Sequence, residues 1–191
     1  MRYSLALELP EAAKAAIHEQ LAGTAAISKD LRWLDPANWF VVIRFLGGAQ
    51  GASLAQLKRS VAEIAENVVP FSLSTGTLGF YPEAGPLRTV WLSMKDNEGW
   101  LRRLVDEAAS RSRELHETAE GRDREFVPHI VLARAPDRAP KPGVRSELRQ
   151  HRVQPVEFSV EALSLVRSLL KKGGAQYDVP FRAPFTARIA S

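Results

Sequence analysis

A histidine and an arginine in one short segment are the residues of this chain whose types and spacing could act on a phosphate group. The segment, residues 128–134, reads Pro-His-Ile-Val-Leu-Ala-Arg. Histidine can exchange a proton near neutral pH, and the guanidinium of arginine can donate two parallel hydrogen bonds to a phosphate. His129 and Val131 would share a face of a strand, whereas Arg134, at an odd offset, would have to reach that face from the strand end. Taken alone, such a histidine is more often structural than catalytic.

A second segment has similar spacing but no group that could transfer a proton. Residues 40–47 read Phe-Val-Val-Ile-Arg-Phe-Leu-Gly. Taken alone, Phe40 and Val42 are ordinary residues of a buried strand. Arg44 is two residues beyond Val42, so we expect it on the face that Phe40 and Val42 share. There it would border a site or form an outer salt bridge.

The segments that must position these residues are strands and helices without the regular alternation of a parallel α/β sheet. Strands are expected near residues 5–9, 38–46, 71–79, 88–95, 127–134, 153–160, 162–170 and 176–182. Helices are expected from Pro10 to about Ala22, from a Ser53–Gln56 capping box to a point before Pro70, and from a cap at Asn97 to Leu115. Residues 135–145 contain three prolines and should form a loop. The pattern predicts an α+β fold in a single domain, residues 1–191.

Composition permits a nucleotide or nucleic-acid ligand without requiring one. The chain has 191 residues and a net charge of +4, and arginine outnumbers lysine 19 to 7. Arginine suits phosphate binding, but a GC-rich genome would favour arginine and alanine equally. The absence of cysteine excludes disulfides and thiolate metal sites. No apolar run approaches the roughly 18 residues of a membrane span, and the N-terminus reads as a strand rather than a signal peptide. We expect a cytoplasmic monomer without a membrane segment.

Three stretches, in the same order, resemble the RNA 2′,3′-cyclic phosphodiesterase group of the 2H phosphoesterase superfamily, which includes the bacterial 2′-5′ RNA ligases. Residues 32–47 are similar to the family's Arg-Trp, Pro and Asn followed by His-x-Thr-x-Arg-Phe-Leu-Gly. Residues 126–134 are similar to Phe-x-Pro-His-x-Thr-Leu-Ala-Arg, and residues 164–177 to the closing hairpin. The resemblance implies two pseudo-symmetric lobes around a central cleft, each an antiparallel sheet with helices outside. One His-x-Thr strand from each lobe would line the cleft.

The resemblance also implies which residues bear on catalysis. In the family, two histidines are understood to act as general base and general acid on opposite sides of phosphorus, without a metal or other cofactor. Two threonines donate hydrogen bonds to phosphate oxygens. By this resemblance His129 is the second catalytic histidine, and Phe40 stands at the position of the first. Val42 and Val131 stand at the threonine positions, and Arg134 is the arginine that assists them.

Two further residues are expected on the substrate side. Arg44 would border the cleft from the first motif strand. Tyr81 lies in a loop where the family has an aromatic residue and a proline near its substrate, although a solvated turn is an equal alternative. The other histidines, His18, His116 and His151, are not placed at the cleft by the family pattern.

Three functions remain open at this point. The first is an RNA or nucleotide 2′,3′-cyclic phosphodiesterase with related 2′-5′ ligase chemistry, impaired or lost because three catalytic groups are replaced. The second is a non-catalytic module that binds RNA ends or nucleotides with a 2′,3′-cyclic or terminal phosphate. The third is a site variant of an active enzyme. Losing one general acid or base usually costs on the order of 10²–10⁴ in rate, so the replacements argue against full activity.

Overall fold

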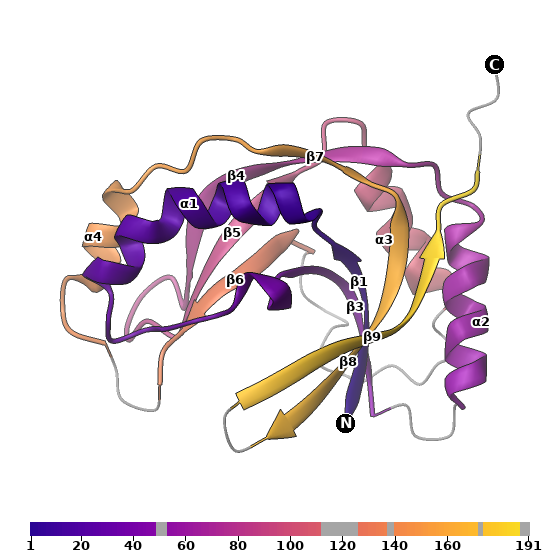
Figure 1. The fold of residues 1–191 in the computed structure, drawn as a ribbon, viewed down its shortest axis with the longest axis horizontal. Coiled ribbons are helices and arrows are strands. Elements are labelled where there is room, and N and C mark those ends of the chain that lie inside the picture. Colours follow the sequence, from indigo (N-terminus) through magenta and orange to yellow (C-terminus); the bar gives the residue numbers. More distant parts are fainter. Residues whose placement is uncertain (49–52, 112–125, 137–139, 172–173, 188–191) are drawn as a thin grey trace.

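Two antiparallel sheets form the framework of the protein in the computed structural model (Figure 1), which describes residues 1–48, 53–111, 126–136, 140–171 and 174–187. The first sheet has the order β3-β1-β8-β9, with β1 (Arg2–Glu8), β3 (Phe40–Gly47), β8 (Ala162–Lys171) and β9 (Gly174–Pro184). The second has the order β2-β6-β5-β4-β7, with β2 (Arg32–Trp33), β4 (Phe71–Tyr81), β5 (Thr89–Lys95), β6 (His129–Arg134) and β7 (Glu157–Val160). The α+β prediction is confirmed.

Four helices and a short 3-10 turn complete the described chain. They are α1 (Glu11–Ile27), the turn Pro36–Asn38, α2 (Leu54–Ala65), α3 (Trp100–Arg111) and α4 (Val144–Gln150). In Figure 1, α2 and α3 lie at the first sheet, where α2 contacts β8 and β9 and α3 contacts β3. At the opposite end, α4 contacts α1 and β4. Within the described residues, no helix is long and apolar enough to cross a bilayer.

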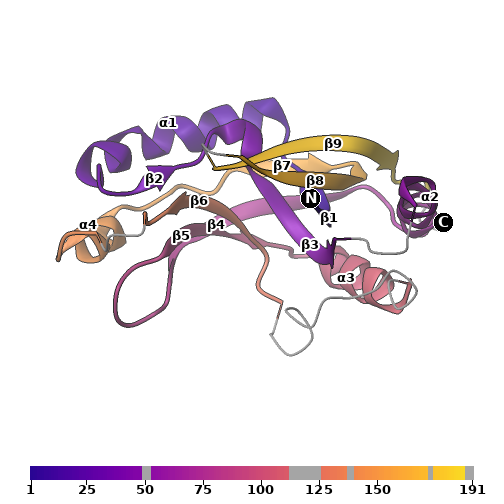
Figure 2. The same ribbon diagram turned by 90° about the horizontal axis from the view of Figure 1, so that it is seen from below.

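The two sheets share one hydrophobic core, which fixes how their strands meet. Leu5 and Leu7 of β1, Leu92 of β5, and Leu101 and Leu104 of α3 belong to the same buried cluster. β3, at the edge of the first sheet, contacts β6 of the second (Figure 2). The strands that carry the two sequence motifs therefore lie next to each other where the sheets join.

Local capping agrees with the sequence at one helix and differs at another. The Ser53 side chain accepts from the Gln56 backbone N–H, and the Gln56 side chain accepts from the Ser53 N–H, so the predicted capping box at α2 is confirmed. At α3 the prediction of Asn97 is wrong. The Asp96 carboxylate accepts from the backbone N–H groups of Glu98, Gly99 and Leu101 instead.

Two segments depart from the predicted elements. Residues 135–145 were expected to be a loop, but α4 begins at Val144, directly after Gly143, whose φ is +98°. The strand predicted over 153–160 is shorter and covers only Glu157–Val160. Leu115, His116 and residues 172–173 of the predicted hairpin turn lie outside the described residues.

Candidate functional site

The four positions that the family resemblance assigns to the two His-x-Thr motifs lie on partly exposed faces of β3 and β6. Phe40, Val42, His129 and Val131 are all half-buried. The residues between and after them are buried in the core: Val41, Ile43, Ile130 and Leu132. On an ordinary buried strand, Phe40 and Val42 would be core residues. Here they are not, because both are half-buried. We call the side of the sheets that bears the four half-buried residues the motif face.

A β-bulge in β6 returns Arg134 to the motif face. Ser93 pairs with His129 and Trp91 with Val131, but Val90 pairs with Ala133, so Leu132 is an extra residue. Such an insertion shifts the alternation of side chains by one. Thr89 then pairs with Arg134, and Thr89 is two residues from Trp91 on the regular strand β5. Arg134, the last residue of β6, thus shares the face of His129, so the expectation that its odd offset takes it off that face is wrong.

An equivalent bulge in β3 moves Arg44 off the motif face and puts Phe45 on it. Ala6 pairs with Val42 and Leu5 with Arg44, so Ile43 is the extra residue. Leu5 and Leu7 lie on the opposite face, and the Arg44 Nε is buried. The prediction that Arg44 shares a face with Phe40 and Val42 is therefore wrong. The next pair joins Phe45 to Ser4 on the motif face, where the Phe45 side chain is 59% exposed.

The surroundings of His129 fix its orientation. Its Nδ1 lies 2.7 Å from the Val127 carbonyl oxygen. Because a carbonyl can only accept, Nδ1 carries the proton in this contact, and Nε2 is left as the nitrogen that can meet a ligand. The Trp91 ring lies 5.3 Å from the imidazole. Gly79 makes room for Trp91, because a Cβ at that position would come within 2.1 Å of the indole.

The surroundings of Phe40 are aromatic on one side and polar on the other. Its ring centroid is 6.0 Å from that of Tyr177 on β9. Glu8 pairs with Phe40 across β1 and β3 and is the carboxylate nearest to it by register. The Glu8 carboxylate accepts from the Ser164 hydroxyl and lies 3.6 Å from the Arg182 Nε. It is thus directed along the first sheet towards β8 and β9 rather than towards β6.

Glu8 also borders a cavity of about 350 Å³, which Glu11, Lys14, Glu161 and Arg182 help to line. The lining does not include Phe40 or His129. Lys14 is bonded to Glu11 at 2.7 Å, so charges of both signs are already paired there. None of the four motif residues lines this cavity.

Two of the other three histidines can be placed, and neither replaces the first motif histidine. His18 is exposed on α1, with its ring 6.4 Å from Trp39. Trp39 precedes Phe40 in extended chain and is 1% exposed, so it points to the opposite side. His151 Nε2 lies 2.8 Å from the Gln20 carbonyl oxygen, between α4 and α1. His116 lies outside the described residues.

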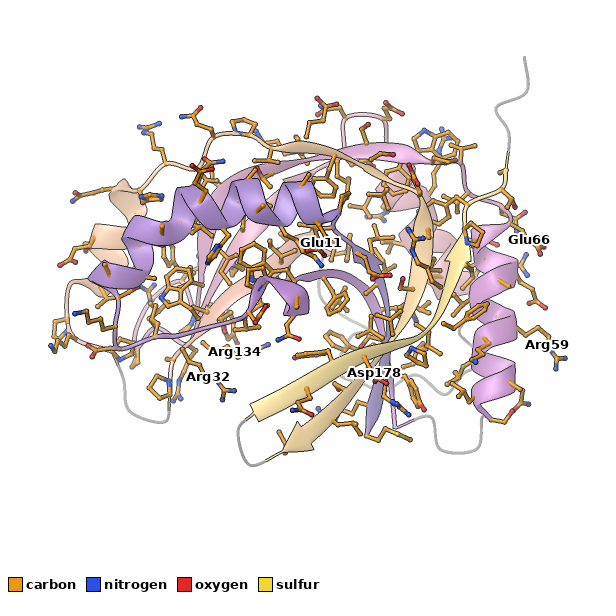
Figure 3. The ribbon with its side chains drawn as sticks, viewed as in Figure 1. Glu11, Arg32, Arg59, Glu66, Arg134 and Asp178 are labelled. Atoms are coloured by element: carbon orange, nitrogen blue, oxygen red, sulfur yellow. The ribbon has the colours of Figure 1, made fainter. Side chains whose placement is uncertain are left out.

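Tyr81 and Arg32 lie on the motif face of the second sheet. Tyr81 pairs with Thr89, and its side chain is 53% exposed. Arg32 pairs with Arg134 across β2 and β6, and Figure 3 shows the two arginines close together. The sequence pattern does not identify Arg32 or Phe45 as site residues, although both lie in the first resembling stretch.

The comparisons with known proteins agree with this architecture. A family model described as the 2′-5′ RNA ligase superfamily matches residues 43–172. A curated RNA 2′,3′-cyclic phosphodiesterase of Thermus thermophilus is 32% identical over 186 residues, covering 94% of this chain and 87% of the relative. One of Aquifex aeolicus is 26% identical over 151 residues, covering 78% of each chain.

Solved structures share the fold. The crystal structure of the Thermus thermophilus protein TT0787 has a TM-score of 0.80 at 28% identity and covers 99% of this chain and 100% of that one. The crystal structure of apo LigT of E. coli has a TM-score of 0.71 at 21% identity and covers 97% of this chain and 98% of that one.

Two antiparallel sheets that meet at a pair of motif strands, with helices packed against them, define a LigT-like α+β protein. The family model spans more than half of the chain, and the Thermus relative aligns with nearly all of it. The chain belongs to the 2′-5′ RNA ligase superfamily. The matched region contains His129 and Arg134 but begins after Phe40 and Val42.

Proposed function

We propose that this protein binds RNA ends or nucleotides carrying a 2′,3′-cyclic or terminal phosphate on the motif face, and that its own cyclic-phosphodiesterase chemistry is strongly impaired. One observation carries the proposal. The bulge at Leu132 puts Arg134 on the face of His129, which also bears Phe40, Val42 and Val131 at the positions that the resemblance assigns to the remaining catalytic groups. The curated relatives named above are RNA 2′,3′-cyclic phosphodiesterases, and E. coli LigT has been crystallised with 3′-AMP and with phosphate.

The phosphate contacts that remain are cationic and directional. Arg134 is exposed and can offer two parallel N–H groups to a phosphate. Nε2 of His129 can add a third contact when the ring is protonated. Phe45, at the equivalent place on β3, offers an exposed aromatic face on which a nucleobase can stack. These residues together suit a nucleotide with a free or cyclic phosphate.

Within the described residues, this face does not carry the complete set of groups that opening a cyclic phosphate requires. One group must take a proton from water and another must protonate the leaving oxygen. His129 can do one of these, but Phe40 cannot exchange a proton, and Glu8 is engaged by Ser164 and Arg182. Val42 and Val131 lack hydroxyls, and losing one such donor costs on the order of 10²–10³ in rate. The losses explain why we favour binding over turnover.

Binding and turnover should be tested together. Calorimetry at low salt should detect binding of 3′-AMP and of 2′,3′-cyclic AMP, and Arg134→Gln should weaken both about tenfold or more, since a charge-assisted contact contributes roughly 1.5–3 kcal/mol. Arg59→Gln is the matched control, because Arg59 is exposed on α2, far from Arg134 (Figure 3). Chromatography of an RNA ending in a cyclic phosphate should show little product. The proposal would be contradicted if neither nucleotide bound and Arg134→Gln changed nothing. Rapid turnover of the RNA by the unmodified protein would also contradict it.

A further inference from the structure

Two glycines of β4 make room for the side chains of β5 that are nearest by register to His129 on the motif face. Gly79 pairs with Trp91, and a Cβ at Gly79 would come within 2.1 Å of the indole. A Cβ at Gly76 would come within 2.3 Å of the Oγ of Ser93, the residue that pairs with His129. Trp91 and Ser93 therefore lie over β4, in space that the two glycines leave open.

The Ser93 hydroxyl is bonded to β4 and not to the histidine opposite it. It accepts from the Thr77 backbone N–H at 2.9 Å and donates to the Thr77 carbonyl at 3.2 Å. These two bonds bridge the irregularity of β4 between Thr75 and Leu78. The hydroxyl nearest to His129 by register is thus already used between β4 and β5.

The imidazole of His129 is left with one polar partner and one aromatic neighbour. Its Nδ1 is bonded to the Val127 carbonyl, and the Trp91 ring lies 5.3 Å away at an angle of 56°. Tilted ring pairs at this separation attract each other. The hydrogen bond holds one nitrogen, whereas the indole occupies one side of the ring and restricts rotation about the Cα–Cβ bond. Both side chains are half-buried, so the arrangement lies at the surface where a ligand would meet it.

We infer that Trp91 is a positioning residue, which holds the His129 imidazole in the orientation where Nε2 meets a phosphate. Trp91 itself need not touch the ligand. Ordering one free side chain on binding lowers affinity by about two- to tenfold, and a ring already held by its neighbours avoids that cost. Gly79 serves the same end, because it leaves the space in which the indole lies. This inference rests on the proposed function, because it takes His129 to contact the phosphate.

The test is a double-mutant cycle between Trp91 and His129, with inorganic phosphate and 3′-AMP as ligands. NMR titration at low salt suits it, because this method also follows weak binding. Trp91→Ala should weaken both ligands by about two- to tenfold, and Trp91→Phe should recover most of the loss because it restores an aromatic neighbour. In a His129→Ala background, Trp91→Ala should change neither affinity. If Trp91→Ala does not fold, Trp91→Leu, which keeps more of the volume, takes its place in the cycle.

Trp100→Ala is the matched control. Trp100 is also a half-buried tryptophan, but it lies on α3, where the Arg103 guanidinium is 4.5 Å from its ring. Its loss should leave both affinities unchanged. Nitrogen NMR of the neutral imidazole gives a second readout, since a purely structural Trp91 would not affect it. His129 should carry its proton on Nδ1 in the unmodified protein, and Trp91→Ala should add the form protonated on Nε2.

The positioning role and the proposed function fail in different ways. If Trp91→Ala weakens 3′-AMP equally in the presence and absence of His129 but leaves phosphate unaffected, the indole stacks on the base and the positioning role is overturned. If Trp91→Ala lowers the free energy of unfolding and changes no affinity, its role is structural and the inference is again overturned. Both results leave the proposed function standing, provided that Arg134→Gln weakens binding. Absence of all binding, with an inert Arg134→Gln, removes the proposed function and this inference together.

Discussion

Introducing the three groups that the family resemblance expects on the motif face should create a cyclic phosphodiesterase. The change is Phe40→His, Val42→Thr and Val131→Thr in one chain. A second proton-transfer group is worth on the order of 10²–10⁴ in rate, and each hydroxyl aimed at a phosphate oxygen can add on the order of 10²–10³. These factors do not multiply freely, since groups that act as a unit are not additive. We expect turnover at least about 10²-fold above that of the unmodified chain.

The structure indicates that the triple variant will fold. Val42 and Val131 are half-buried on the motif face, so each new hydroxyl can remain hydrated and its burial penalty stays small. Phe40 loses its contact with Tyr177, whose ring is 6.0 Å away. Truncating a fully buried phenylalanine to alanine costs about 3–5 kcal/mol. A half-exposed ring replaced by imidazole should cost less, roughly 1–2 kcal/mol of the free energy of unfolding.

The assay follows 2′,3′-cyclic AMP and a short RNA with a cyclic phosphate end by chromatography. Phe40→His alone should give most of the gain, because it supplies the missing partner of His129, whereas the two Val→Thr changes alone should give little. Adding His129→Ala to the triple variant should abolish turnover. A triple variant that folds normally but is inactive would refute the reasoning, because Phe40 and His129 would then not act on one phosphate.

Three further predictions concern metal, packing and charge. Turnover by the restored variant should survive EDTA, since the proton transfer is assigned to histidines alone; loss with EDTA and recovery with Mn²⁺ would refute this. Gly79→Ala should destabilise the protein by about 1–3 kcal/mol in chemical denaturation and alter Trp91 fluorescence, because its Cβ would overlap the indole. Gly23→Ala, in open space on α1, should instead stabilise by about 0.5–1 kcal/mol. The hydrogen bond that Arg167 donates to Asp178 lowers the pKa of that carboxyl below its ordinary value of 3.8. Their pairing therefore stabilises the fold above pH 3.8, and this stabilisation is lost as the pH falls through the lowered pKa. Asp178→Asn should therefore lower the thermal midpoint at neutral pH, and equal midpoints there would contradict the assignment.

The order of the main elements could be predicted because each has a strong local signal. The capping box at Ser53 specifies the start of α2, and the β-branched and aromatic residues of 40–47 specify β3. The segment of α4 gave no such signal. It has only seven residues, follows two prolines and a glycine, and buries just Val144 and Leu148. Asp96 could be mistaken for a residue before the cap because its neighbour Asn97 has the same preference for helix starts.

The motif face could be predicted only as far as the alternation of side chains continues. Phe40, Val42, His129 and Val131 are placed by a period of two, and that part of the sequence argument agrees with the burial pattern. Beyond them, the bulges at Ile43 and Leu132 reverse the alternation. Neither residue has a type that marks a bulge, since both are ordinary apolar strand residues. The faces of Arg44, Phe45 and Arg134 could therefore not be read from spacing alone.

The two bulges occur at the same step of the two motif strands, which bears on the proposal that the site binds a phosphate without turning it over. Each strand presents its first, third and sixth motif residues on the motif face. On β6 these are His129, Val131 and Arg134, and on β3 they are Phe40, Val42 and Phe45. In the proposed site, Arg134 of β6 would contact the phosphate and Phe45 of β3 would stack on the base. Opening a cyclic phosphate requires both a general base and a general acid, and the family resemblance assigns one of them to each motif strand. With Phe40 at the position where the family has a histidine, one requirement of catalysis is unmet, whereas Arg134 and Phe45 remain on the motif face.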